Sequence, residues 1–128
     1  MKKEIENRQD VFFLVDTFYT KVRADKLLGP IFNEAIDYWT AHLERLTDFW
    51  ETNLFFVNKF KGNPVRKHQE LDTNNNRTID SLHFGVWLRY WLETLETHFR
   101  GERAALAKNR ARTMGTHLFL KIFENRLT

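Results

Sequence analysis

The side chains best suited to chemistry in this chain are its five histidines, which stand at positions 42, 68, 83, 98 and 117. None of them forms the His-x-x-x-His pair of a hydrolytic zinc site, so that class of enzyme has no support. The chain contains no cysteine. Disulfides, cysteine-ligated zinc, iron–sulfur clusters and thiol catalysis are therefore excluded. A lone histidine is most often an ordinary surface or hydrogen-bonded residue, so its surroundings decide whether it has a function.

Two of the histidines stand apart by their surroundings. His42 shares a helical face with Trp39 and Phe49, so its ring should point inward, where an imidazole without a partner is costly to bury. His68 follows Pro64 by four residues on a short predicted helix. A histidine that binds a metal needs such a firmly held position, with its second ring nitrogen bonded to a backbone carbonyl or to water. His68 is therefore the candidate ligand.

Tyr19 and Trp87 are aromatic residues that end in a polar group, and they lie on helical faces that are otherwise mostly apolar. A buried tyrosine hydroxyl or tryptophan indole needs a hydrogen-bond acceptor, and for either residue alone a backbone carbonyl is the ordinary one. Together with His42, however, they are three polar side chains on three different predicted helices. With His68 as a fourth, they could surround a single cavity.

The composition agrees with a helical domain that holds such a cavity. Aromatic residues make up 15 % of the 128 residues and include twelve Phe and four Trp. They can fill a core or line a cavity around a flat apolar ligand. The two prolines and five glycines leave room for long helices. We expect residues 1–128 to form one all-α domain.

Apolar residues recur at intervals of three and four along most of the chain, which predicts amphipathic helices. The first helix runs from Val11 toward Leu28, is broken by Gly29-Pro30 and is followed by a short aromatic corner. A second begins near Asp37 and reaches Leu54, and Pro64 can open a short third one that carries His68.

The C-terminal half contains two further predicted helices. The helix from Ser81 to Phe99 is apolar on nearly every side, so we expect it to be buried centrally. After a turn around Gly101, a last helix includes Ala107 and reaches Ile122. No segment predicts a strand.

The segment from Asp72 to Asp80 is the most polar one and is predicted to be an exposed connection. Its first residues have the spacing of the first ligands in a calcium-binding loop. Arg77, however, stands where that loop needs a glycine, and His83 stands where it needs a bidentate glutamate. We therefore interpret the segment as a loop and not as a calcium site.

The formal charge is +3, with both signs interspersed along the chain. Mixed charges favour a solvated surface over a face that binds nucleic acid. No apolar run approaches the roughly twenty residues of a membrane span, and the N-terminus has no apolar region typical of a secretory signal. We expect a cytoplasmic protein that binds neither nucleic acid nor membranes.

Several of these segments, in this order, resemble the group III truncated haemoglobins. The similarity extends from Asp10 to Phe123. The segments that carry it are Tyr19, Leu28-Gly29-Pro30-Ile31-Phe32, His42, Phe49-Trp50, Gly62-Asn63-Pro64-Val65-Arg66-Lys67-His68 and Trp87-Leu88. That family has a shortened globin fold, a two-over-two sandwich of helices around a b-type haem. The resemblance therefore implies this fold, with haem b and its iron as the cofactor.

The resemblance also assigns roles to individual residues. It makes His68 the proximal ligand of the iron, and Tyr19, His42 and Trp87 the distal residues that stabilise a bound ligand. The other haem contacts that it implies are Phe32 packed on the haem, Leu46 closing the distal side, Phe49 and Trp50 on the far wall, and Arg45, Arg66 and Lys67 as candidate partners of the propionates.

The implied function is the binding of dioxygen, nitric oxide or peroxide at the iron. A hydrogen bond to a charged group contributes about 1.5–3 kcal/mol, so the polar distal pocket would hold dioxygen too tightly for transport and suits peroxide or nitric oxide chemistry better. Enzyme and sensor both stay open, because peroxidase-like or nitric-oxide-detoxifying turnover would need electrons from an external reductase. The alternative function is a haem-free helical binding or adaptor module, whose aromatic residues simply form its core.

Overall fold

The protein is described by a computed structural model over residues 2–60 and 62–126, and almost all of its regular structure is helical. The predicted all-α class is confirmed. In chain order the elements are β1 (Lys3–Glu4), α1 (Arg8–Ala24), α2 (Gly29–Ala35), α3 (Trp39–Phe55), α4 (Pro64–Asn74), α5 (Ser81–His98), β2 (Phe99–Arg100) and α6 (Glu102–Arg126).

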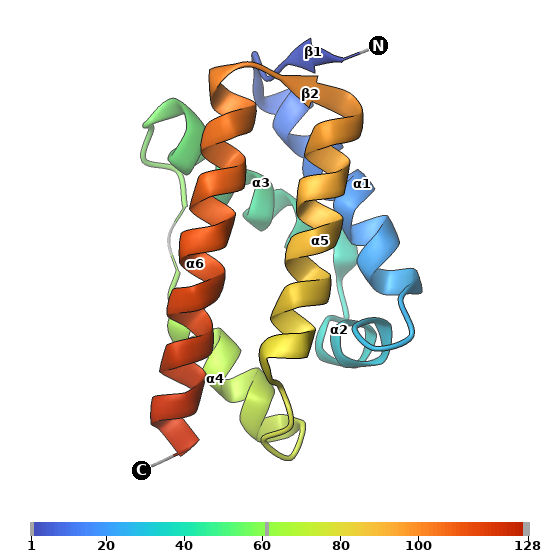
Figure 1. Ribbon diagram of the computed structural model, residues 1–128, viewed down its shortest axis with the longest axis vertical. Coiled ribbons are helices and arrows are strands. Elements are labelled where there is room, and N and C mark those ends of the chain that lie inside the picture. Colours follow the sequence, from blue (N-terminus) through green and yellow to red (C-terminus); the bar gives the residue numbers. More distant parts are fainter. Residues whose placement is uncertain (1, 61, 127–128) are drawn as a thin grey trace.

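The long helices form two packed pairs. α1 packs against α3, and α5 runs antiparallel to α6 (Figure 1). Contacts between α1 and α5 and between α3 and α6 join the pairs. The short helix α4, yellow-green in Figure 1, packs against the C-terminal half of α6. This arrangement is the predicted two-over-two sandwich.

Trp91 on α5 forms the centre of the core and is only 1 % exposed. Its ring stacks on Trp50 of α3, with centroids 4.4 Å apart, and meets Phe18 of α1 edge-on at 5.0 Å. Its indole N–H donates to the carbonyl of Ala107 on α6 at 3.1 Å. One side chain therefore connects both helix pairs.

The first helix ends earlier than the predicted boundary near Leu28. α1 stops at Ala24 because the Asp25 carboxylate accepts hydrogen bonds from the N–H groups of Leu27 and Leu28, both at 2.9 Å, and so closes a turn. The same carboxylate accepts a hydrogen bond from the Tyr90 hydroxyl of α5 at 2.6 Å. The turn is thereby fixed to the second helix pair.

The predicted aromatic corner is a helix, α2, which begins at Gly29 and Pro30. Proline is tolerated there because the first turn of a helix leaves its N–H groups unpaired. A β-carbon at Gly29 would lie only 2.6 Å from the carbonyl oxygen of Arg23. Glycine therefore lets α2 lie against the end of α1, and this close approach determines where α2 presents Phe32.

The prediction of no strand is wrong at one place. β1 and β2 form a short parallel ladder that pairs Lys3 with Phe99 and Glu4 with Arg100. Two residues per strand are too few to show the alternating pattern by which a strand is predicted. After β2, Gly101 takes a φ of 92°, which glycine adopts without strain, and the chain turns into α6.

The prediction of an exposed segment from Asp72 to Asp80 is wrong at two residues. Asp72 is fully buried in the last turns of α4, and Ile79 is 6 % exposed. The reason is a tertiary contact, since the Asp72 carboxylate binds the guanidinium of Arg126 near the other end of the chain. No local pattern can reveal such a pair.

Helix α5 is not buried along its whole length, contrary to prediction. The C-terminal half is buried, since Trp91, Thr94 and Leu95 are all enclosed. In the first turn, however, Leu82 is 62 % exposed. The N-terminal half borders a cavity through Trp87, so its side chains, among them Val86 and Leu88, are only partly buried against the core. In the described residues, no helix combines the length and the apolarity needed to cross a membrane.

We expect Trp91→Ala to lower the free energy of unfolding by about 3–5 kcal/mol, because it removes a large core side chain and leaves its space unfilled. Leu82→Ala, on the same helix but exposed, should change it by no more than about 0.5 kcal/mol. Chemical denaturation followed by circular dichroism measures both. Equal effects of the two substitutions would contradict a core centred on Trp91.

Candidate functional site

A cavity of about 390 Å³ lies between the helices, within the range typical of small-molecule sites. Every helix from α1 to α6 contributes to its lining. Of the site residues predicted from the sequence, ten line it: Tyr19, Phe32, His42, Arg45, Leu46, Phe49, Trp50, Lys67, His68 and Trp87. The structure therefore brings together residues that are up to 68 positions apart in the sequence (87 − 19).

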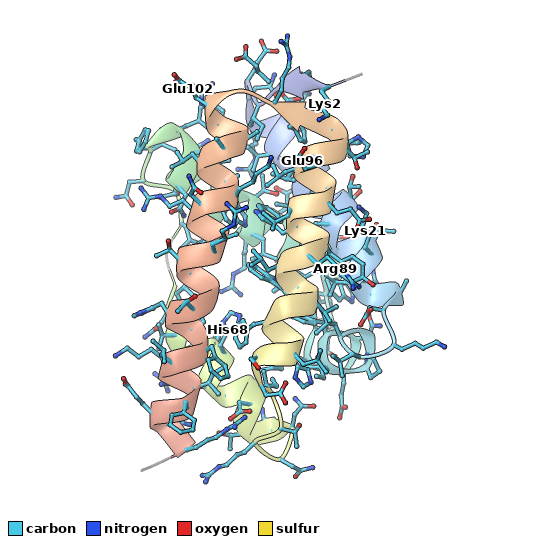
Figure 2. All side chains as sticks on the ribbon, in the orientation of Figure 1. Lys2, Lys21, His68, Arg89, Glu96 and Glu102 are labelled. Carbon is cyan, nitrogen blue, oxygen red and sulfur yellow. The ribbon has the colours of Figure 1, made fainter. Side chains whose placement is uncertain are left out.

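His68 projects from α4 toward the interior (Figure 2). Asn63 caps the start of this helix by accepting the N–H of Arg66 at 3.0 Å, and Pro64 occupies the first turn. The carbonyl of Pro64 lies 2.7 Å from His68 Nδ1. A carbonyl can only accept, so Nδ1 carries the proton and Nε2 is left with a free lone pair.

Burial lowers the pKa of His68, although its hydrogen bond to the Pro64 carbonyl opposes that shift. The ring is therefore neutral near pH 7. A neutral imidazole with its Nδ1 proton held by a backbone carbonyl is the form in which histidine binds a metal through Nε2.

His42 projects from α3 into the same cavity, as its helical face predicts. Within the described residues, its Nε2 is buried and has no hydrogen-bond partner. Burial, helped by the positive charge of Arg45 and by His68, lowers the pKa of His42 to about 4. A neutral, unpartnered ring nitrogen in a cavity is available to a ligand that supplies the missing hydrogen bond.

Tyr19 and Trp87 complete the polar part of the lining. Burial raises the pKa of the Tyr19 hydroxyl well above its usual value, and hydrogen bonding with the Trp87 side chain opposes that rise. The hydroxyl therefore keeps its proton. The rings of Tyr19 and His42 meet edge-on with centroids 5.8 Å apart. The three polar groups thus come from α1, α3 and α5 and share one region of the cavity.

The remaining walls are mostly apolar and aromatic. Phe49 meets Trp50 edge-on at 5.4 Å and Phe60 at 5.1 Å, while Phe32 meets Tyr19 at 5.9 Å. Flat rings and aliphatic side chains around the free Nε2 of His68 suit a planar apolar group that carries a metal.

The three predicted cationic residues are placed differently. Arg45 and Lys67 border the cavity. The Arg66 side chain is 76 % exposed and binds the Glu70 carboxylate at 3.1 Å, one helical turn further along α4. Arg66 is therefore not among the residues that line the cavity.

Sequence reasoning missed about half of the lining. On α6, Met114 and Leu118 have helical spacing that does not distinguish a cavity wall from a core. Phe60 lies in a segment whose polar composition predicts only a loop. The lining residues not singled out as site residues are Phe18, Ala35, Ile36, Phe60, Asn63, Pro64, Glu70, Leu71, Asn74, Met114 and Leu118.

The two-over-two helix sandwich and its enclosed histidine are those of a shortened globin. No family model matches the chain. It is 32 % identical over 121 residues to the group 3 truncated hemoglobin ctb of Campylobacter jejuni, with 91 % of each protein covered. The crystal structure of the group III truncated hemoglobin from Campylobacter jejuni superposes with a TM-score of 0.81 at 32 % identity and covers 92 % of both chains. This chain therefore belongs to the group III truncated haemoglobin family.

The electrostatics of His42 can be tested by NMR of its ring protons in the haem-free protein. We expect a titration midpoint near pH 4, in contrast to an ordinary histidine value of about 6.5. Arg45→Met should raise the midpoint because it removes a positive charge that disfavours the protonated ring. A midpoint near 6.5 in the wild-type protein would show that the ring is solvated.

The same shift makes folding stability depend on pH. The folded-state pKa of His42 lies below the unfolded value, so the unfolded state takes up the proton first as the pH falls. The stability present above about pH 6.5 is lost between about pH 6.5 and pH 4.

Proposed function

We propose that this chain is a single haem-binding domain that holds haem b in the cavity through a bond from His68 to the iron and acts on dioxygen, nitric oxide or peroxide. The observation that carries the proposal is the 2.7 Å contact between His68 Nδ1 and the Pro64 carbonyl inside a cavity with aromatic walls. It leaves Nε2 as a basic nitrogen in a mostly apolar space.

When bound, the haem supplies an iron that binds small diatomic molecules or peroxide and exchanges electrons with them. The chain supplies the polar groups around such a ligand. The Tyr19 hydroxyl keeps its proton and can donate, the Trp87 indole can only donate, and the neutral His42 ring has an unsatisfied Nε2. The Tyr19 and Trp87 donors favour a ligand whose outer atom carries negative charge, and His42 adds a third donor in the tautomer that has its proton on Nε2.

The strength of these hydrogen bonds decides between transport and reaction. Each bond to a charged group contributes about 1.5–3 kcal/mol, and 1.4 kcal/mol slows ligand loss by about tenfold. Two or three donors on one ligand therefore retain it far longer than a carrier can allow. We propose peroxide reduction or nitric oxide conversion, with electrons from an external reductase.

Arg45 and Lys67 are our candidates to pair with the haem propionates, because both border the cavity. Arg66, the third predicted partner, would have to leave Glu70 to join them.

The axial ligand is tested by absorption spectroscopy on protein supplemented with haem. The wild-type protein should show a strong Soret band, and His68→Ala should weaken or shift it because the iron loses its protein ligand. His117→Ala, an exposed histidine on α6, is the matched control and should leave the band unchanged. Unaltered apo-like spectra in all three proteins, with no stabilisation by haemin, would favour the haem-free adaptor.

The distal donors are tested by the rate at which dioxygen leaves the ferrous protein. Trp87→Phe and Tyr19→Phe should each speed its loss by about tenfold or more, since each removes one donor. Tyr90→Phe is the control, because its hydroxyl lies on the same helix as Trp87 but binds Asp25. Loss rates equal to that of the control would remove the argument for tight binding.

A further inference from the structure

The helix that carries His68 is tied to the C-terminal helix by side-chain contacts from two residues. The Gln69 amide donates to the backbone carbonyl of Lys121 at 3.0 Å, and the Asp72 carboxylate binds the guanidinium of Arg126. Both contacts join α4 to α6. They lie immediately after His68 and one turn beyond it.

The Asp72–Arg126 contact is two-pronged. Arg126 Nε donates to Asp72 Oδ2 at 2.9 Å, and Nη2 donates to Oδ1 at 2.7 Å. Asp72 is fully buried, while the Arg126 side chain is 24 % exposed. Two parallel hydrogen bonds fix both the plane of the carboxylate and its distance from the guanidinium. A single hydrogen bond or an apolar contact would not fix both.

The same two residues hold the segment that follows α4. The Arg126 guanidinium also donates to the carbonyl of Ile79. The N–H of Ile79 donates to Asp72 Oδ1 at 2.9 Å, and the N–H of Arg77 donates to the Asp72 carbonyl at 2.7 Å. The segment after α4, predicted to be an exposed connection, is thus held against Asp72 by these hydrogen bonds. Helix α4 cannot rotate or slide without breaking them.

The network is coupled to His68 by helix geometry. Residues four apart in a helix lie on the same side, one above the other. Asp72 is the residue one turn after His68, and His68 is itself bound to Pro64 one turn before it. The ring is thereby held between a fixed helix start and a fixed helix end.

We propose that Asp72 and Arg126 are positioning residues that set the height and rotation of α4 and so the alignment of His68 Nε2 with the iron. This inference rests on the proposed haem-binding function. Neither residue borders the cavity, so both act through the helix and not on the ligand.

The test compares Arg126→Met, Arg126→Lys and Asp72→Asn with the control Lys121→Met. The control removes an exposed ion pair to Glu124 on the same end of α6 and keeps the backbone carbonyl that binds Gln69. Three properties are measured: the rate of haem loss to an excess of apomyoglobin, the iron–histidine stretching frequency in resonance Raman spectra of the ferrous protein, and the thermal midpoint of the haem-free protein.

We expect Arg126→Met and Asp72→Asn to speed haem loss by roughly ten- to a hundredfold, as is common when a group that orients a metal ligand is removed. Both should also shift the iron–histidine frequency. Arg126→Lys keeps the charge but lacks the planar fork, so its rate of haem loss and its iron–histidine frequency should lie between those of the wild-type protein and those of Arg126→Met. Lys121→Met should match the wild-type protein in all three properties.

A lower thermal midpoint with wild-type haem loss and frequency would overturn the proposal, because the pair would then stabilise the fold without positioning the ring. If Arg126→Met does not fold, Arg126→Lys decides, and a wild-type frequency and loss rate in that variant would also overturn it. Failure of the proposed function looks different, since the wild-type protein itself would then give no haem spectrum sensitive to His68→Ala.

Discussion

The hydrogen bond between His68 Nδ1 and the Pro64 carbonyl is the interaction on which the site depends. It forms within one turn of α4 and fixes which ring nitrogen has the proton. What the other nitrogen can reach then depends on where that turn is placed. Asn63 caps it, Pro64 stiffens its start, and the contacts of α4 with α6 decide what Nε2 faces.

A small protein that contains a large cavity depends for its stability on close packing in the rest of its core. Here one aromatic cluster forms both the core and a wall of the cavity. Trp91 packs between Trp50 and Phe18, and these two residues also line the cavity together with Trp87. The rings of Trp87 and Trp91 are stacked, with centroids 6.5 Å apart, so the cavity wall is packed directly on the core.

Features that depend on local spacing could be predicted from the sequence, whereas contacts between distant segments could not. The helical face of His42 and the position of His68 after Pro64 follow from spacing, and the cavity contains both. The spacing of Arg66 and Glu70, four residues apart on one helix, permits their ion pair, but it does not show that Lys67 borders the cavity while Arg66 does not. Nor can it show that Asp72 pairs with Arg126, since the polar residues around Asp72 predict a solvated loop. Four predicted helices agree closely with the structure, but the corner at Asp25 depends on a carboxylate that binds Tyr90 from another helix.

Gly29 has a consequence for how proteins of this kind can be found. Its α-carbon lies so close to the Arg23 carbonyl that any side chain would collide with backbone, which cannot rotate away as a flexible side chain can. A larger residue would push α2 outward and move Phe32 from the cavity wall. Position 29 is therefore closed to the other nineteen amino acids as long as this corner keeps its shape. In a chain that no family model recognises, a Gly-Pro pair at the start of the second helix and a histidine four residues after a later proline make a compact search pattern for divergent members.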